Sequence, residues 1–201
     1  RGMLQWAIGR ADGLIAISEF VAETLYDAGL DADHVHLVLN GIDVARWERS
    51  DGRERVRAEL GIDDDAPVVV TACRLFPAKG VTELVRAMHE IGGDVPDAAL
   101  LVAGGEMVEG YLAELEAMAA ELGIADRVHF LGRRDDIVDV MSAADVFAMP
   151  SFGEPFGLVY AEAMALGLPV VALDNGGTPE VVRHGVDGLL SPSGDAVALA
   201  A

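Results

Sequence analysis

The sequence predicts an α/β protein built on a doubly wound parallel sheet. Short apolar stretches rich in valine, isoleucine, leucine and alanine alternate with longer segments whose apolar residues recur every three to four positions. The short stretches are apolar at consecutive positions, which is typical of strands that helices cover on both sides. Repeated strand–helix–strand units form right-handed crossovers, so we expect a Rossmann-like sheet between two layers of helices.

The first elements precede a turn with the sequence NGID at residues 40–43. Residues 12–18 and 34–40 are apolar and of strand length, and residues 19–30 between them have a helical period. The Asn-Gly pair favours a turn. We place a domain boundary there, with residues 1–40 as the end of one domain and residues 41–201 as a second domain.

The second domain continues the same alternation, and a sheet of about six strands is expected. Strands are expected at residues 66–74, 98–105, 127–132, 145–150, 169–173 and 188–190. Helices are expected at residues 53–61, 79–92, 110–123, 135–144, 156–167 and 177–185, with a last one starting near 194. Because that last helix starts close to residue 201, we expect this domain to be truncated at its C-terminus.

The composition excludes several classes of partner. The chain has 34 acidic and 14 basic residues and a formal net charge of −20, which disfavours nucleic acid and anionic membranes. No run of about 18 apolar residues occurs, so no membrane span is expected. Cys73 is the single cysteine, so no intramolecular disulfide can form, and a reducing, cytoplasmic location is the default.

Lysine is almost missing, since 13 of the 14 basic residues are arginine and the remaining one is Lys79. Many carboxylates with little lysine are typical of a halophilic-type acidic surface, whose self-repulsion high salt screens. A genome of high GC content that encodes arginine in place of lysine would explain the same composition. Both interpretations stay open.

Candidate ligand-binding residues follow the strands, because open α/β sheets bind ligands at the carboxyl ends of their strands. Arg74 ends one expected strand, and Lys79 opens the next expected helix. A guanidinium fork and a mobile ammonium at this edge suit a phosphate group. The alternative is that Lys79 is an ordinary solvated side chain.

A second candidate group lies in the segment PSFGEPFGLVYAE. Glu154 stands in a loop between Gly153 and Pro155, and a helix is expected to begin near Phe156 or Gly157. Free N–H groups at a helix start attract phosphate, and carboxylates accept hydrogen bonds from sugar hydroxyls.

Two further residues have weaker signals. Glu162 lies in the second turn of that helix, where it could bind ribose or simply face solvent. Gly104, at the end of another strand, could leave room for a sugar or belong to an ordinary turn. The five histidines show no metal-ligand spacing, so no metal site is expected.

Five motifs in this order carry a family resemblance: NGID, RLFPAKG, VHFLGRRDDI, PSFGEPFGLVYAEAMALGLPVVA and GGTPEVVRHGVDGLL. Together they resemble the C-terminal nucleotide-sugar-binding domain of retaining glycosyltransferases of family four, the group 1 enzymes with the GT-B fold. Glu154 and Glu162 match the E-x7-E signature of that family, and Arg74 and Lys79 match its R-x4-K pair.

The resemblance implies roles for these residues in hexosyl transfer from a UDP-, GDP- or ADP-sugar without a cofactor. Arg74 and Lys79 would bind the donor diphosphate, Glu154 the sugar and Glu162 the ribose. The implied catalytic residues are Arg74, Lys79 and Glu154. The implied donor-binding residues are Arg74, Lys79, Gly104, Arg133, Glu154, Phe156, Gly157, Leu158 and Glu162. Transfer would occur on the front face with retention, and the leaving phosphate would help to deprotonate the acceptor.

The sequence also departs from the family pattern. Cys73 replaces the familiar glycine before the arginine, and AGGE replaces a spaced glycine pair. Residues 1–40 resemble only the last part of the acceptor domain, so we expect the chain alone to bind donor weakly and to be essentially inactive. The resemblance leaves the acceptor open (a sugar, a lipid-linked or a small molecule), as well as peripheral attachment to the inner membrane face through the acceptor domain.

Two other functions remain as alternatives. Glu154 and Glu162 could be the acid and base of a glycoside hydrolase, although Arg74 and Lys79 would then lack a role. The domain could also be a non-catalytic module that binds nucleotide sugars, because a fold alone does not prove activity.

Overall fold

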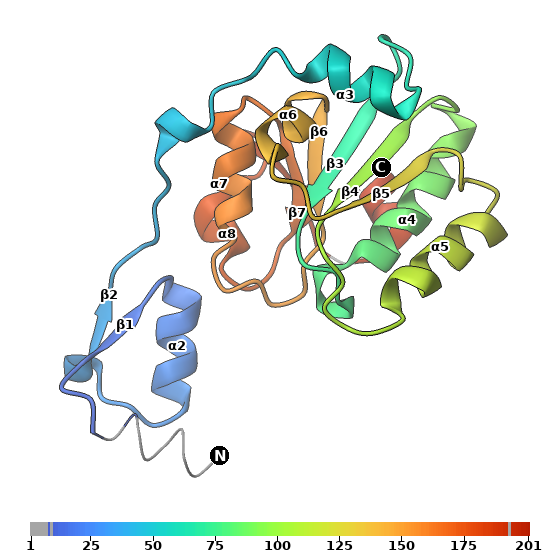
Figure 1. Ribbon diagram of the computed structural model, residues 1–201. Coiled ribbons are helices and arrows are strands. Elements are labelled where there is room, and N and C mark those ends of the chain that lie inside the picture. Colours follow the sequence, from blue (N-terminus) through green and yellow to red (C-terminus); the bar gives the residue numbers. More distant parts are fainter. Residues whose placement is uncertain (1–7, 9, 193) are drawn as a thin grey trace.

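The computed structural model describes residues 8, 10–192 and 194–201, and two parallel sheets organise this part of the chain (Figure 1). The small sheet pairs β1 (Leu14–Ala16) with β2 (Val35–Leu37), and α2 (Glu19–Asp27) connects them. The large sheet has six strands in the order β5-β4-β3-β6-β7-β8. The predicted α/β class with a doubly wound parallel sheet is confirmed.

The six-stranded sheet and the helices from α3 onward form the large unit, and its elements follow the predicted alternation. Its strands are β3 (Val68–Ala72), β4 (Ala99–Ala103), β5 (Val128–Gly132), β6 (Val146–Met149), β7 (Val170–Leu173) and β8 (Gly188–Ser191). Its helices are α3 (Arg53–Leu60), α4 (Val81–Glu90), α5 (Tyr111–Glu121), α6 (Ile137–Ser142), α7 (Leu158–Ala165), α8 (Thr178–Val181) and α9 (Ala196–Ala200).

Two predicted helix boundaries are wrong. Lys79 does not open α4: it ends a 3₁₀ turn (Pro77–Lys79), and Gly80 separates it from the helix with a φ of 70°. Glycine is required there, because a Cβ at residue 80 would lie 2.1 Å from the carbonyl oxygen of Pro150. The helix expected to reach residue 185 ends at Val181, since Val182 takes an extended conformation and buries its side chain in the core.

Apolar residues cover both faces of the large sheet. One face packs against α3, α6 and α7, and the other packs against α4 and α5. Helix α4 shows why: its residues Val81, Leu84, Val85 and Met88 are buried and recur at helical spacing on one side. All five residues of β4 are buried, which explains their consecutive apolar character.

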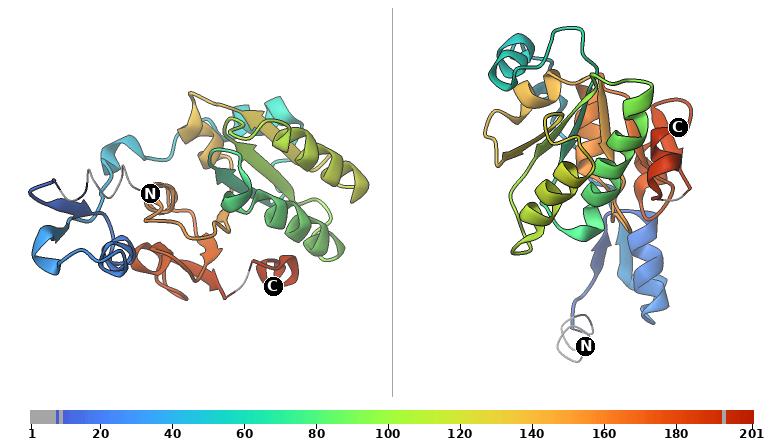
Figure 2. Two further views of the ribbon diagram at one scale, coloured as in Figure 1. Left: turned by 90° about the horizontal axis from the view of Figure 1, so that it is seen from below. Right: turned by 90° about the vertical axis from the view of Figure 1, so that its right-hand side faces the viewer.

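The order of the strands reverses between β3 and β6. From β3 the chain continues outward to β4 and β5, and from β6 it continues the opposite way to β7 and β8. Strands β3 and β6 are direct neighbours, with Val69 opposite Val146. Loops that leave two such strands in opposite directions open a crevice at their carboxyl ends. The small unit, which consists of β1, α2 and β2 and is blue in Figures 1 and 2, projects from one end of the large sheet.

No helix within the described ranges combines the length and the apolar character that crossing a membrane requires.

A buried arginine ties three segments of the large unit together. The side chain of Arg57 on α3 is 1 % exposed and donates to the carbonyl groups of Ala143, Asp63, Asp64 and Ala66. It also pairs with Asp145 at 3.0 Å. One guanidinium thus satisfies the turn after α3, the end of α6 and the residue before β6.

We expect Arg57→Ala to lower the free energy of unfolding by about 3–5 kcal/mol, because it removes the donor to buried carbonyl groups and leaves the space of a large buried side chain empty. Denaturant unfolding monitored by circular dichroism measures this change. Arg46→Ala is the control: it removes an exposed pair with Asp43 and should change stability by less than about 0.5 kcal/mol. A loss below about 1 kcal/mol for Arg57→Ala would contradict the proposed stabilising role.

Candidate functional site

Two neighbouring hollows occupy the crevice at the carboxyl ends of β3 and β6. The first, the central cleft, has a volume of about 330 Å³ and is lined by Ile17, Asn40, Ala72, Cys73, Arg74, Lys79, Met149, Glu154, Pro155, Phe156, Gly157, Leu158 and Val159. The second, the side cleft, has about 300 Å³ and is lined by Trp47, Ala72, Ala103, Gly104, Arg133, Arg134, Ile137, Val159 and Glu162. Ala72 and Val159 line both, so the two clefts adjoin.

An ion pair between Lys79 and Glu154 lies at the centre of the site. Lys79 Nζ is 2.5 Å from Glu154 Oε2, and the two side chains are only 17 % and 10 % exposed. The hydroxyl of Ser151 is 3.0 Å from the same carboxylate oxygen. Lys79 lies in the loop after β3 and Glu154 in the loop after β6, so the pairing of these strands brings the two charges together.

Arg74 provides a second cation in the central cleft. Its side chain is exposed, and among the described residues no carboxylate forms an ion pair with it. Because Lys79 is already neutralised by Glu154, Arg74 leaves a local positive charge in a chain whose overall charge is −20. This local charge suits an anionic ligand.

The thiol of Cys73, directly before Arg74 in the sequence, adds no charge to the central cleft. Burial raises the pKa of Cys73 to about 11, so the thiol is protonated at neutral pH. Cys73 forms a neutral part of the cleft wall.

The start of α7 supplies backbone donors to the central cleft. Gly157 precedes the helix with a φ of 85°, and no side chain caps the first turn. A Cβ at residue 157 would lie 2.3 Å from the ring of Tyr160, so only glycine fits. Gly157 and Leu158 line the cleft, and the side chain of Phe156 is buried beside them. Uncapped N–H groups at a helix start attract anions.

The carboxylate of Glu162 faces the side cleft without a partner. Glu162 is half-buried, and no donor or cation in the described part of the chain compensates its charge. Burial raises its pKa above the ordinary value of a glutamate. A half-buried acceptor of this kind is suited to ligand hydroxyl groups, which can donate to it.

The remaining predicted residues have distinct environments. Gly104 has a φ of 148°, and a Cβ there would lie 1.7 Å from the carbonyl oxygen of Cys73, so this glycine is required by the backbone itself. Arg133 is 88 % exposed and is 4.0 Å from Asp135. Its neighbour Arg134 is already engaged by Glu59 and Asp136, so Arg133 is the more available of the two cations.

Sequence reasoning gave no role to Ser151 or to Trp47, two residues of the site. Ser151 is buried and donates within the loop that carries Glu154, and only its position after an apolar stretch could have signalled this. Trp47 lines the side cleft from the segment between the two sheets, where no periodic pattern marks it.

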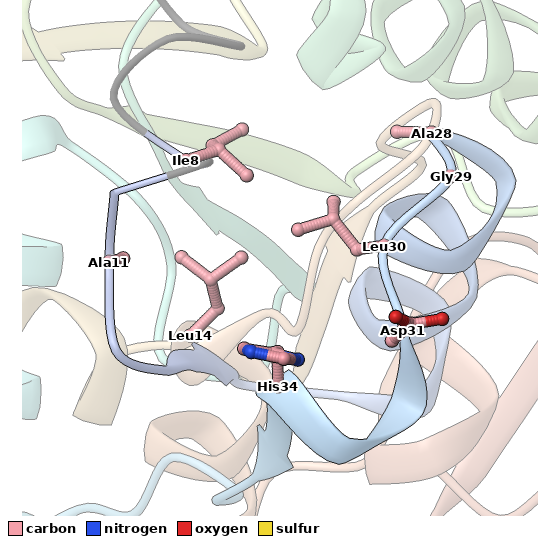
Figure 3. Close-up of a pocket in the computed structure, with 8 residues that line it drawn as sticks. All are labelled: Ile8, Ala11, Leu14, Ala28, Gly29, Leu30, Asp31 and His34. Atoms are coloured by element: carbon pink, nitrogen blue, oxygen red, sulfur yellow. The ribbon is translucent and has the colours of Figure 1, made fainter.

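A third hollow, of about 380 Å³, lies in the small unit and lacks such chemistry. Figure 3 shows the aliphatic side chains of Ile8, Leu14 and Leu30 directed toward one another across it. It borders on Asp31 and His34, and the residues described there form no ion pair like that of Lys79 and Glu154 in the central cleft. In the described ranges, no group of three or more His, Cys, Asp or Glu side chains could hold a metal ion.

Comparison with known proteins gives a consistent assignment across the chain. A model of the family described as Glycosyl transferases group 1 matches residues 52–201, and one described as Glycosyltransferase Family 4 matches residues 1–46. The D-inositol 3-phosphate glycosyltransferase of Mycobacterium sp. (strain KMS) is 42 % identical over 92 % of this chain and 42 % of its own length. The alpha-maltose-1-phosphate synthase of Mycolicibacterium smegmatis is 39 % identical over 92 % of this chain and 49 % of its own. The chain therefore spans less than half the length of these relatives.

Solved structures show the same similarity. The crystal structure of Anabaena Alr3699/HepE in complex with UDP and glucose superimposes with a TM-score of 0.87 and 35 % sequence identity. The match covers 94 % of this chain and 52 % of that one. The resemblance inferred from the motifs is confirmed at the level of the family and the fold.

The raised pKa of Glu162 leads to a prediction about stability. Between the pKa of the unfolded chain and the raised pKa of the folded state, the folded protein holds a proton that the unfolded chain has released. The wild-type protein therefore loses stability as pH rises through this window. We expect Glu162→Gln to stabilise the protein at about pH 7.5 and to have little effect below about pH 4, where the glutamate is protonated in both states.

Denaturant unfolding at both pH values measures this difference. The control is Glu116→Gln on the exposed side of α5, which should shift stability by less than about 0.5 kcal/mol at either pH. Destabilisation by Glu162→Gln at neutral pH would show that the carboxylate is compensated by a contact that the structure does not contain.

Proposed function

The chain belongs to the glycosyl transferases group 1, and we propose that its two clefts bind a nucleoside-diphosphate sugar, whose sugar the full-length protein transfers to an acceptor with retention of configuration. One observation carries the proposal. Two cations, an uncapped helix start and a sequestered carboxylate line a single cleft, and a cleft with a second, uncompensated carboxylate adjoins it.

The central cleft would hold the diphosphate. Arg74 offers a planar fork of donors, and Lys79 offers a mobile ammonium group. The N–H groups of Gly157 and Leu158 add uncharged donors. As the bond between the sugar and the diphosphate breaks, negative charge grows on the leaving oxygen, and fixed positive groups stabilise that charge most in the transition state.

Glu154 would bind hydroxyl groups of the donor sugar. When the diphosphate attracts Lys79, the carboxylate that Lys79 neutralises becomes available as an acceptor, with Ser151 still donating to it. The acceptor hydroxyl would attack from the face that the diphosphate leaves. Its proton would pass to a phosphate oxygen as the new carbon–oxygen bond forms. Because attack and departure occur on the same face of the sugar, the configuration would be retained.

The side cleft would hold the nucleoside. Glu162 would accept hydrogen bonds from the ribose, and the segment at Arg133 would contact the base. Gly104 leaves the wall of this cleft free of a side chain, while the buried Phe156 lines the adjoining central cleft. UDP is the proposed nucleotide, because the Anabaena relative was crystallised with UDP and glucose.

We further propose that residues 1–40 are the end of an acceptor domain and that residues 41–201 form the donor domain. The separation of the two sheets and the adjoining matches to two family models support this division. Ile17 and Asn40 from the first part line the central cleft, so the donor would bind beside the junction of the two domains. The proposed location of the protein is the cytoplasm.

The hydrolase alternative has less support. An acid–base pair should flank one glycosidic bond, yet Glu154 lines the central cleft and Glu162 the side cleft. Glu154 is also engaged by Lys79 and Ser151. A non-catalytic binding module shares the same clefts, and the activity of the full-length protein separates it from a transferase.

Binding of UDP tests the cation assignment. We expect Lys79→Met and Arg74→Met each to weaken UDP binding by about tenfold or more, since each removes a charge-assisted contact to phosphate. Titration calorimetry at constant ionic strength measures the affinity. The control is Arg86→Met on the exposed side of α4, which makes the same change in net charge away from the clefts. Equal UDP affinities for wild type and both cleft variants would contradict the site.

The reaction is tested with the full-length protein and UDP-glucose. NMR of the first-formed product should show the anomeric configuration of the donor. An inverted product, or release of free glucose without transfer to any acceptor, would contradict a retaining transferase.

A further inference from the structure

A hydroxyl from the small unit reaches the loop that carries Glu154. Ser18 is fully buried, and its Oγ donates to the carbonyl oxygen of Pro155 at 2.6 Å across 137 residues of sequence. The same Oγ accepts from the N–H of Val21 at 3.1 Å, which makes Ser18 the N-cap of α2. One side chain therefore both starts a helix of the small unit and holds a carbonyl of the donor-site loop.

A second contact fastens the same helix to the large unit. The carboxylate of Glu180 on α8 accepts from the N–H groups of Glu19 at 2.7 Å and Phe20 at 2.9 Å. Glu180 and Ser18 together satisfy the first three N–H groups of α2. A negative charge at a helix start is also favourable to the helix dipole.

The large unit holds the Glu154 loop from its other side. The N–H of Gly177 donates to the carbonyl of Glu154 at 2.7 Å, and the N–H of Gly153 donates to the side chain of Asn175 at 3.0 Å. Because Gly177 directly precedes α8, which carries Glu180, the contacts close into a ring. We call this ring, made of Ser18, Pro155, Gly177 and Glu180, the junction.

The junction constrains the backbone on which Glu154 sits. Carbonyl groups of two consecutive residues, Glu154 and Pro155, accept hydrogen bonds from two different parts of the chain. Fixing both carbonyls limits rotation of this short segment and with it the direction in which the carboxylate of Glu154 points. That carboxylate faces Lys79 and Ser151 in the central cleft.

We propose that Ser18 is a positioning residue for Glu154, so that recognition of the donor sugar depends on contact with the small unit. This inference rests on the proposed function of the central cleft. Ser18 acts through the carbonyl of Pro155, and its loss changes binding of the sugar portion of the donor. None of the hydrogen bonds of the junction is made by Arg74, Lys79, Gly157 or Leu158, the groups proposed to bind the diphosphate.

A double-mutant cycle with UDP and UDP-glucose as probes tests this role. We expect Ser18→Ala to weaken UDP-glucose binding by about fivefold and to leave UDP binding within about twofold. Ser18→Thr, which retains a hydroxyl, should restore much of the loss. In a Glu154→Gln background, Ser18→Ala should have no further effect on UDP-glucose binding, because the residue through which it acts is already altered.

Thr24→Ala is the control, because it removes an exposed hydroxyl from the same helix at a distance from the clefts. If Ser18→Ala does not fold, Ser18→Gly takes its place, since glycine caps helices almost as well and lacks the hydroxyl.

Outcomes of two kinds in the single mutant, and one in the double mutant, would overturn the inference alone. One is an unchanged preference between the two probes in Ser18→Ala, and the other is a parallel loss of both probes, which indicates a structural role. Additive losses in the double mutant would also overturn it. A wild-type protein that binds neither probe overturns the proposed function, and the inference fails with it.

Discussion

The reversal of strand order between β3 and β6 is the constraint on which the rest of the site depends. Two neighbouring parallel strands send their following segments in opposite directions, which opens a crevice at their carboxyl ends. The loops that border the crevice carry Lys79 and Glu154, which form an ion pair with little solvent exposure. Gly80 is needed for the same reason, since the loop after β3 passes directly against Pro150 after β6.

The electrostatics of the central cleft oppose those of the whole chain. The protein has a net charge of −20, yet the central cleft presents Arg74, Lys79 and the positive start of a helix. Glu154 neutralises Lys79 while no ligand is bound. Glu162 is half-buried and uncompensated, which raises its pKa and costs stability at neutral pH. A group that costs stability and faces a cleft is typical of a functional residue, because its compensation comes from the ligand.

The small unit contributes directly to the site through backbone contacts. Ser18 and Glu180 join α2 to the loop of Glu154 and to α8. The buried Arg57 has a comparable role inside the large unit, where it holds carbonyl groups of the turn after α3 and of the end of α6. In both cases side chains bind backbone groups that are distant from them in sequence and satisfy their hydrogen bonds.

The sequence by itself determined the α/β class, the order of the elements and several of the residues that line the clefts, because local periodicity and the positions after strands are encoded residue by residue. Arg74, Lys79 and Glu154 were identified in this way, and Glu162 was identified through the family resemblance. Only the tertiary structure decided which strands are neighbours, that Lys79 ends a 3₁₀ turn and pairs with Glu154, and that Ser18 contacts Pro155. These features depend on packing between distant segments and on backbone carbonyl groups, which every residue has and which therefore leave no signal in the sequence.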